Sequence, residues 1–376
     1  MIKVALTANT DWYLYNFRLS LATYLREKGF DVTLVSPTGR YVPQLDEMGF
    51  RWIQWELSRR STMPWKEVPA LFSLAAIYRH ERIDLAHHHT IKPVLYGSIA
   101  ARLAGVRSVV NSITGRGYVF LSNEKKAAFL RKIVKPIYRF ALNARSYATI
   151  FENEDDKEYF IEEALIPPER TWLISGVGVD PERFFPATEM DGVPVVLLPG
   201  RLLWDKGVGV LVEAARLLHQ TIEVRVALVG EPDPGNPTSI PESVINSWVQ
   251  EGVVEWWGWK PNMNEIYQAS HIVVSPSMYE GVPTTLLEAA ASGRAIVATD
   301  IPGCRVVVAN GVNGLIVPPN DPEEMANALK QLISDSGLRQ RMGAAGRQIV
   351  LEKFTSSSVN EATLSVYYSV LEQNSH

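Results

Sequence analysis

Apolar residues in the first half of the chain form short β-branched runs that are separated by longer stretches with helical spacing. The runs predict seven strands, at Ile2–Leu6, Val32–Val35, Ile53–Trp55, Leu85–His87, Val109–Asn111, Thr149–Phe151 and Trp172–Ile174. Between them, Phe17–Lys28 and Leu71–Glu81 have the apolar spacing of amphipathic helices. Strands that alternate with helices are typical of βαβ units and a parallel sheet.

The second half of the chain repeats this pattern. Six more strands are predicted, at Val195–Leu198, Val224–Val229, Val254–Trp257, Ile272–Val274, Ala295–Ala298 and Gly314–Val317. Glycine and proline cluster between Ser175 and Pro194, which marks the join between the halves. We therefore predict an α/β protein with two Rossmann-like doubly wound domains, residues 1–179 and 187–360, that face each other across a cleft. We expect residues 361–376 to form a helix that crosses back to the first domain.

Composition narrows the class of protein. A chain of 376 residues favours two domains, and its single cysteine, Cys304, suits a reducing cytoplasm. The chain has no apolar run long enough to predict a membrane span and begins with a strand, not with a signal peptide. It also has no cluster of cysteine and histidine at zinc-ligand spacing, so we expect no bound metal.

Charge is distributed unevenly along the chain. Residues 1–179 contain 24 Lys and Arg against 18 Asp and Glu, whereas the remaining residues contain 13 against 23. A basic first half favours an anionic partner for that half. We do not expect this partner to be a nucleic acid, because the chain as a whole is acidic and carries no recognition motif.

Two glutamates stand in the segment "SPSMYEGVPTTLLEAAASGR" of the second half. Glu280 precedes a predicted helix that begins at Pro283 and ends before Gly293, and Glu288 lies inside that helix among leucines and alanines. A carboxylate in so apolar a setting is costly unless a partner binds it. The start of the helix also offers free N–H groups and a positive dipole end to an anion.

A pair of cations follows the strand Val195–Leu198, in the segment "PGRLLWDKG". Arg201 and Lys206 project from the end of this strand, where two cations could clamp a diphosphate. Taken singly, the cations also fit ordinary surface charge, and the glutamates fit capping or salt-bridge roles. Their occurrence together in one half favours a nucleotide site.

Four segments of the second half occur in the order "GRLLWDKG", "LVGEPDPGNP", "SPSMYEGVPTTLLEAAASGRAIVATDIPGCR" and "NGVNGLIVPPND". This order resembles glycosyltransferases of family 4, which have the two-domain GT-B fold, and the resemblance extends over essentially the whole chain. It implies that Glu288 holds the ribose hydroxyls of a nucleotide-sugar and that Glu280 lies beside the donor sugar. Arg201 and Lys206 would then bind the diphosphate. The resemblance also implies donor contacts at Gly230, Gly281, Val282, Pro283 and Thr284.

The resemblance implies a reaction as well as a site. The enzyme would transfer a sugar from a UDP-sugar substrate with retention of configuration at the anomeric carbon. The reaction would need no cofactor and no obligatory metal. Glu280, Arg201 and Lys206 would form the catalytic set. Charge that develops on the leaving diphosphate would be stabilised by Arg201, Lys206 and a helix N-terminus.

Three segments of the first half follow predicted strands and are candidates for acceptor binding. "NTDWYLYNFR" contains Arg18, "HHHTIKP" contains His87, His89 and Lys92, and "SITGRGYVF" contains Gly115 and Gly117. Glycines at a strand end let the backbone approach a ligand closely, although a plain tight turn explains the same pattern.

These three segments resemble one branch of the family, which adds an N-acetylhexosamine such as GalNAc to sugars on undecaprenyl diphosphate. Arg116 stands where that branch has the leucine of a "TGLG" segment. The implied acceptor is a polyprenyl-diphosphate-linked saccharide of bacterial glycan assembly. Two alternatives stay open: a transferase that acts on a small soluble acceptor, and a non-catalytic subunit that binds a nucleotide-sugar. An NAD oxidoreductase would need glycines after the first strand, and "LTANTDWYLYN" has none.

The segment Lys125–Arg145 bears on whether the acceptor is a lipid. An apolar face is predicted at Ala127, Phe129, Leu130, Ile133, Val134, Ile137, Phe140 and Ala141, and a basic face at Arg131, Lys132, Lys135 and Arg139. A basic amphipathic helix suits an anionic membrane surface. It would place the protein on the cytoplasmic face of the inner membrane. The alternative is a domain helix that packs its apolar face on its own sheet.

Overall fold

A computed structural model describes residues 1–57, 64–116, 120, 125–144 and 146–374, and within these it leaves the side chains of residues 64–66 and 125–128 undescribed. The chain divides into two compact units. The first unit comprises Met1–Val177 and Ser358–His376, and the second comprises Gly178–Ser357. Gly178 and Val179, which the sequence placed with the first domain, therefore belong to the second unit, and residues 358–360, which it placed with the second domain, belong to the first.

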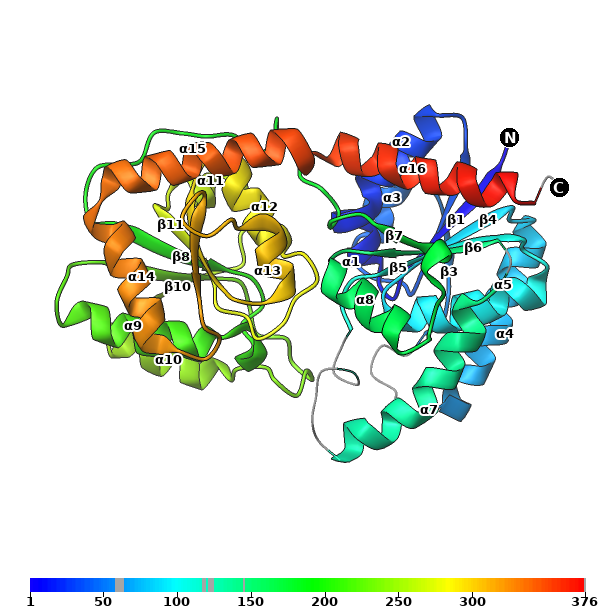
Figure 1. The fold of residues 1–376 in the computed structure, drawn as a ribbon, viewed down its shortest axis with the longest axis horizontal. Helices are drawn as coiled ribbons and strands as arrows, with labels where there is room; N and C mark the ends of the chain where they lie inside the picture. The colour runs from blue at the N-terminus through cyan, green and yellow to red at the C-terminus, as the bar shows by residue number, and fades with distance from the viewer. Residues whose placement is uncertain (58–63, 117–119, 121–124, 145, 375–376) are drawn as a thin grey trace. The chain divides into compact units, whose positions relative to one another are not determined.

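The first unit is built on a parallel sheet of seven strands in the order β3-β2-β1-β4-β5-β6-β7 (Figure 1). All seven predicted strands are confirmed, with ends that differ by one or two residues. They are β1 (Lys3–Thr7), β2 (Asp31–Ser36), β3 (Arg51–Gln54), β4 (Leu85–His89), β5 (Ser108–Ile113), β6 (Tyr147–Phe151) and β7 (Thr171–Leu173).

Helices cover both faces of this sheet because successive strand residues point to opposite sides. Leu6 of β1 belongs to an apolar cluster with α2 and α3, and Ala5 belongs to another with α4 and α5. The helical segments are α1 (Asp11–Tyr13), η1 (Leu14–Arg18), α2 (Leu19–Glu27), α3 (Val42–Glu47), α4 (Pro64–Glu81), η2 (Pro93–Gly97), α5 (Ser98–Ala104), α7 (Lys125–Leu142), α8 (Glu154–Glu162) and η3 (Pro168–Arg170).

The last helix of the chain, α16 (Ser356–Glu372), packs on the first unit. Val366, Tyr367 and Val370 of this helix lie in the same apolar cluster as the inward side chains of β1 and β2. The red helix in Figure 1 therefore completes one face of the first sheet, although it follows the second unit in the sequence.

The second unit is built on a parallel sheet of six strands in the order β10-β9-β8-β11-β12-β13. All six predicted strands are confirmed. They are β8 (Val195–Pro199), β9 (Arg225–Val229), β10 (Glu255–Gly258), β11 (Ile272–Ser275), β12 (Ala295–Thr299) and β13 (Gly314–Val317). The helical segments are η4 (Trp204–Lys206), α9 (Val208–His219), α10 (Glu242–Gln250), α11 (Met263–Gln268), α12 (Thr284–Ala291), α13 (Pro302–Val307), α14 (Pro322–Ser334) and α15 (Ser336–Lys353).

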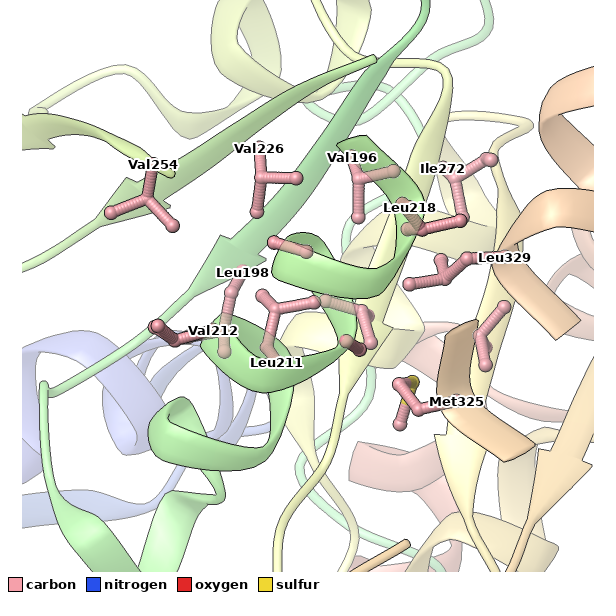
Figure 2. Packing of buried hydrophobic residues seen from close by; sticks show 14 of the residues in the cluster. Val196, Leu198, Leu211, Val212, Leu218, Val226, Val254, Ile272, Met325 and Leu329 are labelled. Carbon is pink, nitrogen blue, oxygen red and sulfur yellow. The ribbon is translucent and has the colours of Figure 1, made fainter. Parts of the chain in front are cut away.

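Close packing of aliphatic side chains fixes the helices on this second sheet (Figure 2). Val196 and Leu198 of β8 meet Leu211 of α9 and Leu329 of α14 on one face. On the other face, Leu197 of β8 shares a cluster with α12 and α13. The loops that leave β8 and β11 therefore start from a rigid core.

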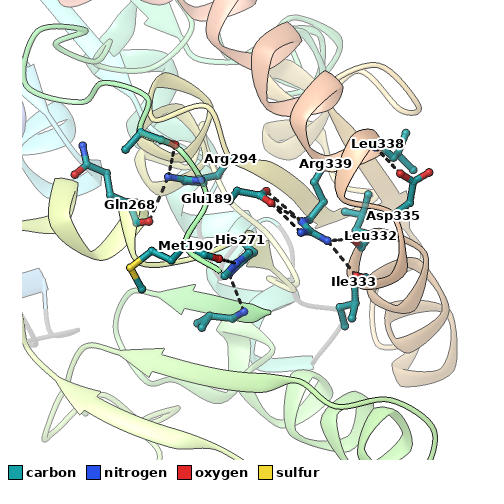
Figure 3. A network of polar contacts seen from close by, with 12 residues as sticks. Glu189, Met190, Gln268, His271, Arg294, Leu332, Ile333, Asp335, Leu338 and Arg339 are labelled. Atoms are coloured by element: carbon teal, nitrogen blue, oxygen red, sulfur yellow. Dashed lines mark hydrogen bonds and ion pairs between the residues drawn. The ribbon is translucent and has the colours of Figure 1, made fainter. Parts of the chain in front are cut away.

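The segment that precedes β8 is held to the rest of the second unit by polar contacts (Figure 3). Arg339 of α15 forms an ion pair with Glu189 at 2.8 Å, and Arg294 donates to the carbonyl of Ala187 at 2.9 Å. His271 contacts the carbonyl of Met190 at 2.9 Å. Residues 187–190 are thus part of the second unit's structure.

Among the helices in the described part of the chain, none combines the length and the apolar composition that a membrane span requires.

Candidate functional site

The strand order of the second sheet reverses direction between β8 and β11, which lie side by side in its centre. At such a switch point the loops leave the sheet on opposite sides, and the crevice between them is where doubly wound sheets bind ligands. The loop after β8 carries Arg201 and Lys206, and the loop after β11 carries Glu280. The fold therefore brings these three predicted residues to one edge.

Lys206 and Glu280 form an ion pair across this switch point. Ser277 donates a second hydrogen bond to the same carboxylate at 3.1 Å. Both charged side chains keep partial access to solvent, 26% for Lys206 and 20% for Glu280. The ammonium group is thus held in place and remains reachable by an anionic ligand.

Arg201 pairs with an acidic residue that the sequence reasoning missed. Its guanidinium lies 2.7 Å from Asp233, in the loop after β9. The backbones of the two loops also pair, because Leu202 donates to the carbonyl of Glu231 at 3.0 Å. Each cation expected at the diphosphate is therefore oriented by a carboxylate from a neighbouring loop.

Two glycines allow the donor loops to approach other backbone closely. Gly207 has φ +71°, and a Cβ built on it would lie 1.9 Å from the carbonyl oxygen of Pro276. A Cβ on Gly303, in α13, would lie 1.4 Å from the carbonyl oxygen of Gly281. Any side chain at either position must move backbone, so these glycines fix the path of the loop that carries Glu280.

Asp205 strengthens the link between the two loops. Its carbonyl accepts from the backbone N–H of Met278 at 3.0 Å, and its carboxylate accepts from the hydroxyl of Tyr279 at 3.2 Å. Burial and the nearby carboxylates of Asp205 and Glu280 raise the pKa of Tyr279 to about 12. Tyr279 therefore stays neutral and keeps the O–H group that donates the hydrogen bond to Asp205.

Glu288 lies within α12 and has a partner that the sequence did not reveal. The hydroxyl of Tyr267, in α11, donates to the Glu288 carboxylate at 2.7 Å. Glu288 is partly exposed, and the protein that crowds its carboxyl group raises its pKa to about 7, against the lowering influence of Tyr267 and Arg183. Tyr267 leaves the other carboxylate oxygen available to a diol.

The remaining donor-side residues follow the same edge. Pro283, predicted as the first helical residue, is the N-cap residue of α12, so the helix begins one position later than predicted, at Thr284. Gly230, with φ +136°, follows β9 and packs against the carbonyl of Gly200. Gly281 and Val282 lie in the loop between Glu280 and α12.

In the first unit, the three histidines of β4 have different surroundings. His87 is buried, with its two ring nitrogens 2.7 Å from the hydroxyls of Tyr367 and Ser112. His88 points to the other face of the sheet and bonds to Asn111 and Tyr78. Burial lowers the pKa of His88 to about 4. His87 and His88 are thus engaged inside the protein.

Arg18 and His89 lie at the carboxyl edge of β1 and β4. Arg18 donates to the hydroxyl of Tyr13 at 3.0 Å, and the ring of His89 lies 3.9 Å from that of His87. Lys92 forms an ion pair with the buried Glu67 at 3.0 Å. The structure thus brings Arg18, His87 and His89 together, while Lys92 is tied to α4.

Arg116 has a structural role that explains part of the departure from the "TGLG" pattern. Its Nε lies 2.7 Å from Asp156 in the first turn of α8, and its guanidinium lies over the ring of Tyr159. Gly115 has φ +126°, a conformation open to glycine. Gly117 lies outside the described residues.

Helix α7 differs from the predicted arrangement because its apolar positions divide between two surfaces. One surface of α7 packs against the rest of the first unit through Val134, Ile137, Tyr138, Ala141 and Leu142. Phe129, Ile133 and Phe140 are exposed, by 65%, 45% and 54%. The protein therefore covers only part of the predicted apolar face and leaves the other part exposed. Arg145, at the end of the predicted segment, lies outside the described residues.

Two of the basic residues of α7 contact other parts of the first unit. Lys135 forms an ion pair with Glu163, just after α8. Arg139 donates to the carbonyls of Glu163 and Ala164, both at 3.0 Å. The prediction that both cations lie on an open basic face is corrected by these contacts.

Comparison with known proteins agrees with the two-unit fold. Residues 3–153 match the family model "Glycosyl transferase 4-like", and residues 193–335 match "Glycosyl transferases group 1". The chain is 26% identical to the N,N'-diacetylbacillosaminyl-diphospho-undecaprenol alpha-1,3-N-acetylgalactosaminyltransferase of Campylobacter jejuni, over 99% of this chain and 100% of that one. It is 28% identical to a UDP-Gal:alpha-D-GlcNAc-diphosphoundecaprenol alpha-1,3-galactosyltransferase of Escherichia coli, over 85% of both chains.

Solved structures show the same architecture. The Anabaena HepE protein in complex with UDP superposes with a TM-score of 0.77 at 19% identity, over 98% of this chain and 100% of that one. The two parallel-sheet domains, the donor-side edge and the matches to both halves lead to one conclusion: the chain belongs to the family 4 glycosyltransferases of the GT-B fold.

Proposed function

We propose that this glycosyltransferase moves a sugar, an N-acetylhexosamine such as GalNAc, from a UDP-sugar to a saccharide on undecaprenyl diphosphate. The observation that carries the proposal is the full-length similarity to the Campylobacter enzyme, whose name states this acceptor class. The donor-side edge of the second unit, with Lys206 and Glu280 paired at the switch point, supports a nucleotide diphosphate as the leaving group.

In the proposed reaction the described side chains act mainly through charge and position. Glu288 accepts hydrogen bonds from the ribose hydroxyls, with its orientation set by Tyr267. Lys206 and Arg201 stabilise the negative charge that grows on the departing diphosphate, which lowers the barrier more than it tightens ground-state binding. Glu280 lies beside Lys206, where the donor sugar would sit. The transfer proceeds with retention and needs no metal ion or cofactor.

A membrane-bound acceptor requires the protein to work at a surface. Exposed Phe129 and Ile133 lie one turn apart on α7, with the exposed Lys132 beside them. Aromatic and aliphatic side chains next to lysine are typical of segments that lie in the interface of an anionic bilayer. We propose that this part of α7 contacts the cytoplasmic face of the inner membrane.

The test is an assay of the purified protein with a panel of UDP-sugars and two acceptors, a short-chain polyprenyl-diphosphate saccharide and a free sugar phosphate. We expect transfer to the diphosphate-linked acceptor, with an α-anomeric product that NMR identifies, in the presence of EDTA. Transfer only to the soluble sugar phosphate would favour the alternative acceptor class. Binding of UDP without transfer to any acceptor would favour a non-catalytic subunit.

A further inference from the structure

The backbone is unusual at the centre of the first sheet, where the strand order reverses between β1 and β4. The chain enters a π-helical turn after each of these strands, η1 after β1 and η2 after β4. Thr90, between β4 and η2, has φ +72°. Left-handed backbone is strained for a β-branched residue, and π-helical turns are rare, so both features point to a functional site.

The same place holds buried polar atoms with no partner among the described residues. They are both ring nitrogens of His89, Oγ1 of Thr90 and Nε of Arg18. His89 is fully buried and Arg18 is 5% exposed. Because buried polar atoms are almost always hydrogen-bonded in proteins, their concentration at a switch point indicates a ligand site.

Charge decides which ligand this site favours. Arg18 donates to the neutral hydroxyl of Tyr13, and within the described ranges it forms no ion pair with a carboxylate. Glu152 acts on Tyr13 through its charge, and Asp11 accepts from the backbone N–H of Tyr41 at 2.7 Å. A buried cation that lacks an ion-pair partner is costly until an anion binds it.

The histidines beside Arg18 are uncharged, so Arg18 carries the positive charge of this site. Burial, followed by repulsion from neighbouring charged groups, lowers the pKa of both His87 and His89 well below the ordinary value. Both rings are therefore neutral at physiological pH, so His89 offers one N–H donor beside the guanidinium. An N–H donor, a hydroxyl and a guanidinium suit phosphate oxygens.

We propose that Arg18, His89 and Thr90 form an anion subsite that binds a phosphate group of the acceptor. The inference rests on the proposed function, since it assigns the diphosphate of the acceptor to particular side chains. Tyr13 is the partly exposed neighbour of buried Arg18, and its hydroxyl accepts a hydrogen bond from the guanidinium. His87 holds this edge in place through Tyr367 and Ser112.

Two acceptors that carry the same saccharide test the proposal, one on a short-chain diphosphate and one on an uncharged alkyl group. In Arg18→Met, KM for the diphosphate acceptor should rise about tenfold or more, because a charged hydrogen bond is lost. KM for the alkyl acceptor and for the donor should stay within about twofold, which a general structural role would not produce. Arg18→Lys should recover part of the loss. Arg26→Met, an exposed arginine of α2, is the matched control.

An equal rise of both acceptor KM values in Arg18→Met would overturn the proposal, because the saccharide or the fold would then be affected. A separate measurement does not need transfer. Calorimetry of inorganic pyrophosphate into wild-type protein saturated with UDP should show binding that Arg18→Met and Arg18→Lys weaken and Arg26→Met retains. Absence of this binding in wild type would also overturn it. If wild type binds pyrophosphate and transfers to neither acceptor, the proposed function fails and the subsite stands.

Discussion

The hydroxyl of Tyr267 donates a hydrogen bond of 2.7 Å to the carboxylate of Glu288, from α11 to α12. This contact fixes the rotamer of a carboxylate whose pKa is raised to about 7 by the protein around it. A ribose diol that donates to Glu288 must favour the ionised form, since a protonated carboxyl group has fewer acceptor sites. We therefore expect nucleotide binding and the protonation of Glu288 to be coupled.

Glu288→Gln should weaken UDP binding by about 1.5–3 kcal/mol at pH 8, because a neutral amide replaces the charged acceptor. Calorimetry measures this change. The wild-type affinity should fall as the pH drops below the Glu288 pKa of about 7. Binding at pH 7 should release about half a proton from this group, because about half of the free carboxyl groups are protonated there. The nucleotide phosphate also titrates, so the difference between wild type and Glu288→Gln isolates the contribution of Glu288. Equal affinity of the two proteins at pH 8 would contradict the ribose assignment.

The same carboxyl group should make stability depend on pH in the opposite direction. Its pKa is about 7 when folded and 4.5 in the reference state, so the folded protein binds more protons between these values. The stability that the protonated group provides is present below pH 4.5 and is lost as the pH rises through about 7. The Tm of Glu288→Gln relative to wild type should therefore increase from pH 6 to pH 8. A Tm difference that is constant over this range would argue against the raised pKa.

Lys206→Ala and Arg201→Ala should lower kcat more than they raise the donor KM, because the charge that these cations stabilise grows as the bond to the diphosphate breaks. The expected loss of kcat for Lys206→Ala is about 100-fold or more. The Lys206–Glu280 pair is partly exposed, so stability should fall by no more than about 1 kcal/mol. Arg216→Ala, which removes a partly exposed cation of α9 that also forms ion pairs, is the control. A change in KM alone would assign the cations to ground-state binding.

Gly303→Ala should reduce activity and stability together. The new Cβ would lie 1.4 Å from the carbonyl oxygen of Gly281 and 2.8 Å from that of Glu280, so the backbone of the donor loop must move. Gly337→Ala is the matched control, because the nearest atom belongs to the flexible end of Arg341 at 3.3 Å. Thermal melting and the donor KM should change in Gly303→Ala only. Activity of Gly303→Ala equal to wild type would show that the loop tolerates displacement.

Replacement of Phe129 and Ile133 by serine should release the protein from anionic vesicles while leaving Tm within a few degrees, because both side chains are exposed. Charge reversal at Lys135 or Arg139 would confuse this test, since both contact the end of α8. Leu351→Ser, an exposed position of α15, serves as the control in co-sedimentation. Transfer to a long-chain acceptor should slow more than transfer to a short-chain one. Undiminished sedimentation of the double variant would mean that α7 is an ordinary domain helix.

The sequence by itself determined the strands and their grouping. Short apolar runs such as Val32–Val35 predicted all thirteen strands. The signal is clearest for central strands, because a strand buried on both faces of a parallel sheet is apolar throughout. The order of Arg201, Lys206, Glu280 and Glu288 along the chain predicted the donor side. These features are local, so they can be read without knowledge of the fold.

Tertiary structure alone decided which groups meet. Tyr267 is 21 residues from Glu288 and Asp233 is 32 residues from Arg201, and no periodicity signals such contacts. The two surfaces of α7 have the same cause: helical spacing shows which residues share a face, whereas the neighbouring core decides which of them are covered. His87 and His89 lie two residues apart at the end of the same strand. Tyr367 and Ser112 form hydrogen bonds with the ring nitrogens of His87, whereas those of His89 have no partner among the described residues. Burial and hydrogen bonding depend on what lies nearby in space, which the linear pattern does not contain.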